Sequence, residues 1–188
     1  GGGTSWLRIE VPVGHPDFGK ALACQCQQEV VTADRVTRLQ RYSNLGYLTR
    51  LTFLNLDPSG RAMDLAERQQ FHRTFEAAHA YAEAPQGWFV LAGPSGSGKT
   101  HLAAAIANRC LEQGRATYFM TVPDLLDHLR AAFAPTADVP YDELFDQVRN
   151  APLLVLDDLG AHASTPWAHE KLYQVLNHRG GAQLPTVI

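Results

Sequence analysis

One octapeptide constrains the fold of this 188-residue chain more than any other feature. It reads Gly-Pro-Ser-Gly-Ser-Gly-Lys-Thr from Gly93 to Thr100 and fits the pattern G-x-x-x-x-G-K-[ST] without a mismatch. A continuous apolar run, Trp88–Ala92, precedes it and is typical of a strand buried on both faces. A helical apolar pattern follows from about Gly98 to Leu111. The sequence therefore predicts a glycine-rich loop between a strand and a helix.

This loop has the residue types that a triphosphate requires. Its glycines let the backbone approach phosphate oxygens, and the helix N-terminus adds N–H donors and partial positive charge. Lys99 is expected to reach the β- and γ-phosphates, and the Thr100 hydroxyl to hold Mg²⁺. The alternative is a turn without a ligand, which the flanking strand and helix disfavour. We expect ATP to contact the following residues: Gly93, Pro94, Ser95, Gly96, Ser97, Gly98, Lys99, Thr100 and His101.

Two acids follow a second apolar run. Leu153–Leu156 predicts a buried strand, and Asp157 and Asp158 come directly after it. Ligands of parallel sheets bind beyond the carboxyl ends of the strands. We expect Asp157 to orient Mg²⁺ and Asp158 to position the attacking water, so that Lys99, Asp157 and Asp158 form the catalytic set. An aspartate in the second position reaches less far than glutamate and predicts slow hydrolysis. The alternative is a pair of solvated acids at a strand end.

Strand and helix patterns alternate along the second half of the chain. A further strand is predicted at Ala116–Met120, with helices at Val122–Phe133, from Pro140 to Val148, and from Thr165 to His178. This alternation indicates an α/β fold with a parallel sheet. A long helix is predicted from about Met63 to Ala84, and a short one at 33–42 that Ser43–Gly46 ends. Residues 1–30 contain several prolines and glycines close together and are predicted to be rich in loops.

Composition excludes several other classes of protein. The formal charge of −3 provides no general attraction for nucleic acid, so any basic surface must be local. Three cysteines are too few for a disulfide scaffold and favour a reducing compartment. The longest apolar runs fall far short of the roughly 20 residues that span a bilayer. We expect a cytoplasmic protein without a membrane partner.

Several motifs resemble those of the DnaC/DnaI-like bacterial helicase-loader ATPases, an AAA+ family. They are Gly-Lys-Thr-His-Leu-Ala at 98–103, Leu-Asp-Asp-Leu-Gly at 156–160 and Thr-Pro-Trp-Ala-His-Glu-Lys-Leu at 165–172. The resemblance implies a P-loop NTPase core, a three-layer sandwich, over residues 45–188, and a small N-terminal appendage over residues 1–44. It also implies that the core is incomplete at its C-terminus, because Leu184–Ile188 resembles the strand that leads to the family's sensor-1 asparagine.

The same resemblance implies a function. A helicase loader would bind a replicative helicase hexamer and single-stranded DNA under the control of ATP, hydrolyse ATP and assemble with itself. Arg130 lies where initiator-type relatives face single-stranded DNA, although an ordinary surface arginine is the alternative. The IstB-like transposition helper ATPases share these motifs, so a transposase is the other partner to consider. A nucleotide-gated binding module with negligible hydrolysis is a third reading.

Other candidate residues have weaker patterns. Cys24 and Cys26 resemble half of a zinc site, and Zn²⁺ is expected only in a longer parent chain because a structural site needs four ligands. Arg179 is predicted to lie at a helix C-terminus, where its positive charge interacts favourably with the helix dipole. The alternative is a contact with the phosphate of a nucleotide bound to a neighbouring subunit. His101 is expected to pack or cap rather than to catalyse. Cys110 and the pair Phe71 and Phe75 are predicted core residues.

Overall fold

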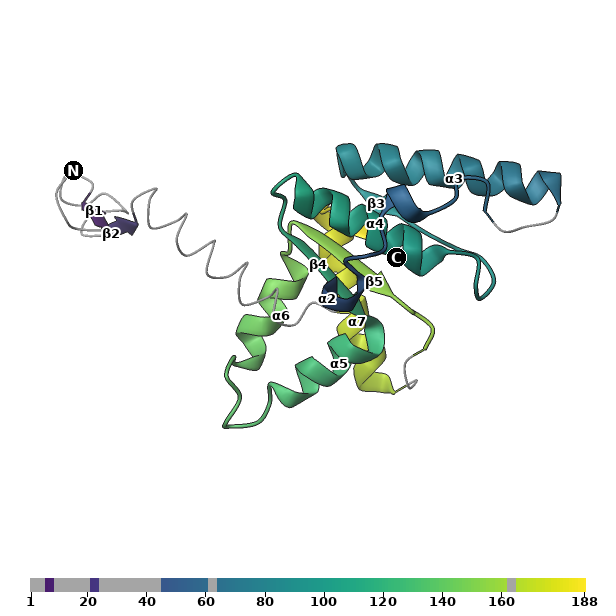
Figure 1. Cartoon of the computed structure of the whole chain (residues 1–188). Coiled ribbons are helices and arrows are strands. Elements are labelled where there is room, and N and C mark those ends of the chain that lie inside the picture. The colour runs from purple at the N-terminus through teal and green to yellow at the C-terminus, as the bar shows by residue number, and fades with distance from the viewer. Residues whose placement is uncertain (1–5, 9–20, 24–44, 61–63, 162–164) are drawn as a thin grey trace. The chain divides into compact units, whose positions relative to one another are not determined.

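The computed structural model describes residues 6–8, 21–23, 45–60, 64–161 and 165–188. The chain divides into two units, Gly1–Arg41 and Tyr42–Ile188. In the first unit, β1 (Trp6–Arg8) and β2 (Ala21–Ala23) pair as antiparallel strands (Figure 1). The prediction that residues 1–30 are rich in loops did not include these two short strands. Three residues are too few to show the alternating pattern from which a strand is predicted.

The second unit is built on a parallel sheet with the strand order β3-β6-β5-β4. The strands are β3 (Trp88–Phe89), β4 (Thr117–Thr121), β5 (Leu153–Asp157) and β6 (Thr186–Val187). Pairing continues beyond β3, because the Leu91 N–H donates to the Ile188 carbonyl at 2.7 Å. The predicted α/β fold with a parallel sheet is confirmed. The sheet also shows that β6 lies between β3 and β5, which brings the ends of the loop strand and of the acidic strand to one edge.

Helices cover both faces of this sheet (Figure 1). One face packs against α3 and α4 through a core that includes Phe75, Ile106, Phe119 and Val155. Residues that alternate with these along the strands, such as Met120, point to the opposite face. The helices are α2 (Leu45–Leu48), α3 (Leu65–Glu83), α4 (Lys99–Glu112), α5 (Val122–Ala131), α6 (Tyr141–Arg149) and α7 (Pro166–Gly181), with a 3₁₀ turn, η1 (Phe53–Asn55).

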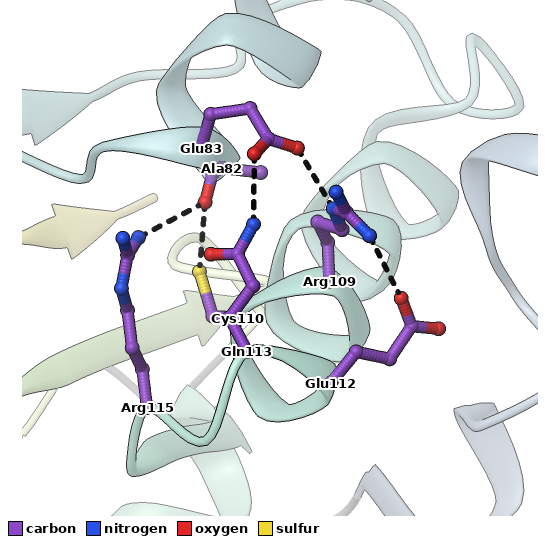
Figure 2. A network of polar contacts seen from close by, with 7 residues as sticks. All are labelled: Ala82, Glu83, Arg109, Cys110, Glu112, Gln113 and Arg115. Carbon is purple, nitrogen blue, oxygen red and sulfur yellow. Dashed lines mark hydrogen bonds and ion pairs between the residues drawn. The ribbon is translucent and has the colours of Figure 1, made fainter.

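A polar network fixes the end of α3 against the end of α4 (Figure 2). The Glu83 carboxylate accepts hydrogen bonds from Arg109 Nε at 2.8 Å and from Gln113 Nε2 at 2.9 Å. The Ala82 carbonyl, at the last turn of α3, accepts from Cys110 Sγ and from the Arg115 guanidinium. Cys110 is completely buried, as predicted, and burial raises the pKa of its thiol. These contacts hold the two helices in one layer.

Two helix boundaries differ from the prediction. The predicted short helix at 33–42 lies outside the described residues, and Gly46, from the stop signal predicted after it, is the second residue of a separate helix, α2. Helix α7 begins at the predicted Thr165 cap but continues through Gly180 and Gly181. The left-handed residue after the helix is Gln183, with a φ of 53°. This conformation lets the Leu184 N–H donate to the Arg179 carbonyl at 2.9 Å and so closes the end of α7. Within the described residues, no helix is both long and apolar enough to span a membrane.

Candidate nucleotide-binding site

The predicted phosphate loop lies between β3 and α4. Gly98 precedes the helix with a left-handed φ of 90°, and Gly96 has a φ of 78° with open space where a Cβ would lie. The Lys99 ammonium donates to the carbonyls of Gly93 at 2.9 Å and Pro94 at 2.8 Å. The lysine therefore spans the loop that it belongs to, and its charge faces the inside of that loop.

The first turn of α4 supplies the expected donors. Leu102 N–H donates to the Gly98 carbonyl at 2.9 Å, so the N–H groups of Lys99, Thr100 and His101 point beyond the start of the helix. Such N–H groups and the helix dipole together favour phosphate. The open cradle at Gly96, the lysine charge and these donors fit a nucleotide triphosphate.

The Phe71 ring of α3 packs against the phosphate loop at Gly98. A Cβ built on Gly98 would lie 3.1 Å from Phe71 Cε2, and one built on Gly60 would lie 3.0 Å from Cδ1 of the same ring. Gly98 is thus required for its φ and for its contact with Phe71. The half-buried ring packs against the core, as predicted, and Phe75 is buried one turn later.

The two acids lie at the carboxyl edge of the sheet. Asp157 is the last residue of β5 and pairs in register with Thr121 of β4. Asp158 is exposed and has a left-handed φ of 55°. Strand β3, which leads to Lys99 and Thr100, and β5 are both paired to β6. The predicted catalytic and metal-binding residues thus belong to one edge of the sheet.

Arg130 belongs to a cluster of aromatic and basic side chains that the sequence analysis missed. Its guanidinium lies 5.0 Å from the centre of the Trp167 ring and is paired with Asp127 at 3.1 Å. Phe133 stacks on Tyr141 with ring centres 4.2 Å apart, and 56% of Phe133 is exposed. These residues come from α5, α6, α7 and the loop after α5, so no local motif connects them. We call Arg130, Phe133, Tyr141, Phe145, Trp167 and Lys171 the aromatic cluster.

Arg179 lies in the last turn of α7, as predicted, but it is buried rather than available to a neighbouring subunit. Its side chain is completely buried and donates to Thr186 Oγ1 at 2.9 Å and to the Ala151 carbonyl at 2.8 Å. Burial lowers the pKa of the guanidinium to about 10. A side chain enclosed in this way does not contact the phosphate of a neighbouring subunit, so that reading is wrong. Its role is to join α7 to β6 and to the segment before β5.

The predicted zinc half-site, Cys24 and Cys26, lies outside the described residues. Among the residues that are described, no group of three or more His, Cys, Asp or Glu side chains is placed to hold a metal ion.

This sheet order, with one strand between the loop strand and the acidic strand, defines an AAA+ type P-loop ATP-binding domain. The family model described as IstB-like ATP binding protein matches residues 31–187, and the chain belongs to this family. The replicative helicase loader DnaI of Bacillus subtilis (strain 168) is 33% identical over 132 residues, which are 69% of this chain and 39% of that protein. The predicted resemblance to the DnaC/DnaI-like ATPases is confirmed.

Two further matches agree. The replicative helicase loader DnaC of Escherichia coli (strain K12) is 30% identical over 98 residues, which are 52% of this chain and 40% of that protein. A crystal structure of DnaI matches with a TM-score of 0.53 at 28% identity and covers 72% of this chain and 71% of that one. The chain spans about 40% of the length of these two curated relatives.

Proposed function

We propose that this chain is the ATP-binding core of a bacterial replicative helicase loader, in which ATP controls binding to the helicase hexamer and to single-stranded DNA. The observation that carries the proposal is the phosphate loop at the same sheet edge as Asp157 and Asp158. The names of the relatives, DnaI and DnaC, support the choice of partner. The chain would also assemble with itself when nucleotide is bound.

The residues of the site have distinct roles in this proposal. Lys99 leaves the carbonyls of Gly93 and Pro94 and binds the phosphates, together with the N–H groups at the start of α4. Thr100 and Asp157 would hold Mg²⁺, which neutralises phosphate charge when it is bound. Asp158 positions the attacking water through its exposed carboxylate. Turnover is slow because the aspartate side chain is short.

Single-stranded DNA would bind at the aromatic cluster. Bases stack on exposed aromatic rings irrespective of sequence, and each stacked base contributes about 1–3 kcal/mol. Phe133 offers the exposed ring, and Arg130 supplies a cation beside it. Arg130 is paired with Asp127 and Lys171 with Glu170, both at 3.1 Å, so base stacking on the exposed ring carries this proposal rather than net charge.

The DNA proposal is tested by fluorescence anisotropy with a labelled oligonucleotide in the presence of ATP. Phe133→Ala should weaken binding about tenfold, the loss of roughly one stacked base. Tyr173→Ala is the matched control, because Tyr173 is 68% exposed on α7 and makes none of the cluster's ring contacts given above. Equal affinity for wild type and Phe133→Ala would contradict the proposed interface.

The helicase proposal is tested by light scattering of the chain mixed with a replicative helicase hexamer. We expect a complex of defined mass whose amount differs between ATP, ADP and no nucleotide. The absence of a complex in all three states would contradict the loader role.

The second candidate is a transposition helper, which the description of the matched family favours. A nucleotide-dependent complex with a transposase, and none with the helicase, would establish it. A third candidate is a binding module that binds ATP without hydrolysis. Phosphate release measured with and without single-stranded DNA separates that module from an ATPase.

A further inference from the structure

His101 connects the phosphate loop to a distant part of the chain. Its ring Nε2 lies 3.1 Å from the Thr52 carbonyl and 3.2 Å from Asn55 Oδ1. Asn55 Oδ1 also accepts from Thr52 N–H at 3.0 Å, and its amide nitrogen donates to the Arg50 carbonyl. Both groups that face Nε2 are therefore acceptors. It follows that Nε2 carries a hydrogen and donates a hydrogen bond to the turn at 52–55.

A second side chain of α4 holds the same part of the chain further along. The buried Asn108 donates through Nδ2 to the carbonyls of Leu48 at 3.0 Å and Leu51 at 2.8 Å. His101 and Asn108 are seven residues apart, about two helical turns, and so lie on one face of α4. We call residues 45–56 the pre-core segment. It contains α2 and η1, is separated from α3 by residues 57–64, and is attached to α4 by these two side chains.

Only the His101 attachment lies next to the phosphate loop. The backbone N–H of His101 is one of the free donors at the start of α4, whereas its side chain holds Thr52. Asn108 is roughly 10 Å further along the helix axis. A change in the first turn of α4 therefore reaches the pre-core segment through His101 and leaves the Asn108 attachment in place.

We propose that His101 is a positioning residue that transmits nucleotide binding at the phosphate loop to the pre-core segment. The proposal rests on the nucleotide binding proposed above. When Lys99 moves from the Gly93 and Pro94 carbonyls to a phosphate, the first turn of α4 is fixed by the ligand. The His101 ring is then held in place together with this first turn, and so is the turn at 52–55 that accepts its hydrogen bond. The hydrogen bonds of residues 52–55 should therefore open less often when ATP is bound than in its absence.

Hydrogen–deuterium exchange of the 188-residue chain, with and without ATP and Mg²⁺, tests this proposal. The Thr52 amide is a direct reporter, because its acceptor is the Asn55 oxygen that faces His101. Nucleotide should slow exchange at residues 52–55 about fivefold, the effect of roughly one stabilised hydrogen bond. His101→Ala should lose this slowing when wild type and variant are compared at equal ATP occupancy, which is set from the Kd of each chain measured by thermal shift. His101→Gln should restore it, because the glutamine amide donates from a similar position.

Asn108→Ala is the matched control. It should speed exchange at residues 48–56 by the same factor in both nucleotide states and keep the nucleotide-dependent slowing. A His101→Ala chain that binds ATP and still shows the slowing would overturn the inference alone. A wild-type chain that binds ATP without any change at 52–55 would do the same. A wild-type chain that does not bind ATP would overturn both this inference and the proposed function.

Discussion

Arg179 of α7 donates through Nε to the Thr186 hydroxyl of β6 at 2.9 Å, and both side chains are completely buried. The same guanidinium donates to the carbonyls of Val148, Arg149 and Ala151, which come just before β5. One side chain thus joins α7 to β6 and to the residues just before β5. Strand β5 ends at Asp157, so the position of the acids depends on this cation.

Replacement of Arg179 should destabilise the chain strongly. Arg179→Met keeps much of the volume but removes the side-chain donor of the Arg149 and Ala151 carbonyls and of the Thr186 hydroxyl, so the free energy of unfolding should fall by about 3 kcal/mol or more. Urea denaturation measures this loss. Arg109→Met is the control, because Arg109 forms an exposed ion pair with Glu83 that solvent screens, and it should cost much less. Similar losses in the two variants would contradict the role assigned to Arg179.

Tyr81 should give the chain an alkaline dependence of stability. Its hydroxyl donates to the Gly87 carbonyl at 3.0 Å, and burial raises its pKa to about 12. The folded chain then holds this proton more tightly than the unfolded chain. The contribution of Tyr81 to stability is complete below pH 10 and is lost as the pH rises from 10 toward 12.

Ultraviolet absorbance of tyrosinate during an alkaline titration checks this expectation, with circular dichroism to follow the fold. Tyr81→Phe should remove a component that titrates near pH 12. It should also flatten the fall in stability above pH 10. An unchanged absorbance curve would mean that Tyr81 is not the late-titrating group.

The sequence predicted the site best where its residues are neighbours. Gly93–Thr100 and the pair after Leu156 are continuous motifs, and the structure has the loop before α4 and the acids at the end of β5, as predicted. The strand before the loop is shorter than predicted, because β3 ends at Phe89 rather than Ala92, and the exposed Trp88 and Val90 show that this run is not buried on both faces. The contacts that support the site join residues far apart, such as His101 to Thr52 and Asn108 to Leu48, which are 49 and 60 positions apart. No periodic pattern relates such pairs.

The burial of Arg179 was missed for a related reason. An arginine in the last turn of a helix is usually exposed, and the dipole alone accounts for its position. Most of its acceptors are backbone carbonyls of other segments, such as that of Ala151. Every residue has such a carbonyl, so the sequence does not indicate which of them will accept from Arg179. Similarly, Gln183 provides the left-handed residue after α7 although Gly180 and Gly181 were the expected signal.

Lys99→Ala should abolish the stabilisation of the chain by ATP. Ligand at 100 times its Kd adds about 2.7 kcal/mol to the free energy of unfolding of a protein that binds it only when folded. Without the ammonium between the Gly93 and Pro94 carbonyls, the loop loses its phosphate-binding charge. A thermal shift assay with ATP and Mg²⁺ measures the change, with exposed Arg73→Ala on α3 as control. If Lys99→Ala shifts as far as wild type, the phosphate-loop assignment is wrong.

Asp158 should tolerate only residues that accept its backbone conformation. Its φ of 55° lies in the left-handed region, which costs most residues about 1 kcal/mol or more but which aspartate and asparagine enter readily. Asp158→Asn should therefore keep the fold and the affinity for ATP but lower the rate of phosphate release at least tenfold, on the order of a lost catalytic base. Asp158→Glu restores a longer carboxylate but also strains the backbone, so it should raise the rate of phosphate release while it lowers the thermal midpoint. An Asp158→Glu chain that releases phosphate no faster than wild type would show that the length of this side chain does not limit hydrolysis, and an unchanged thermal midpoint would show that the left-handed backbone does not restrict this position.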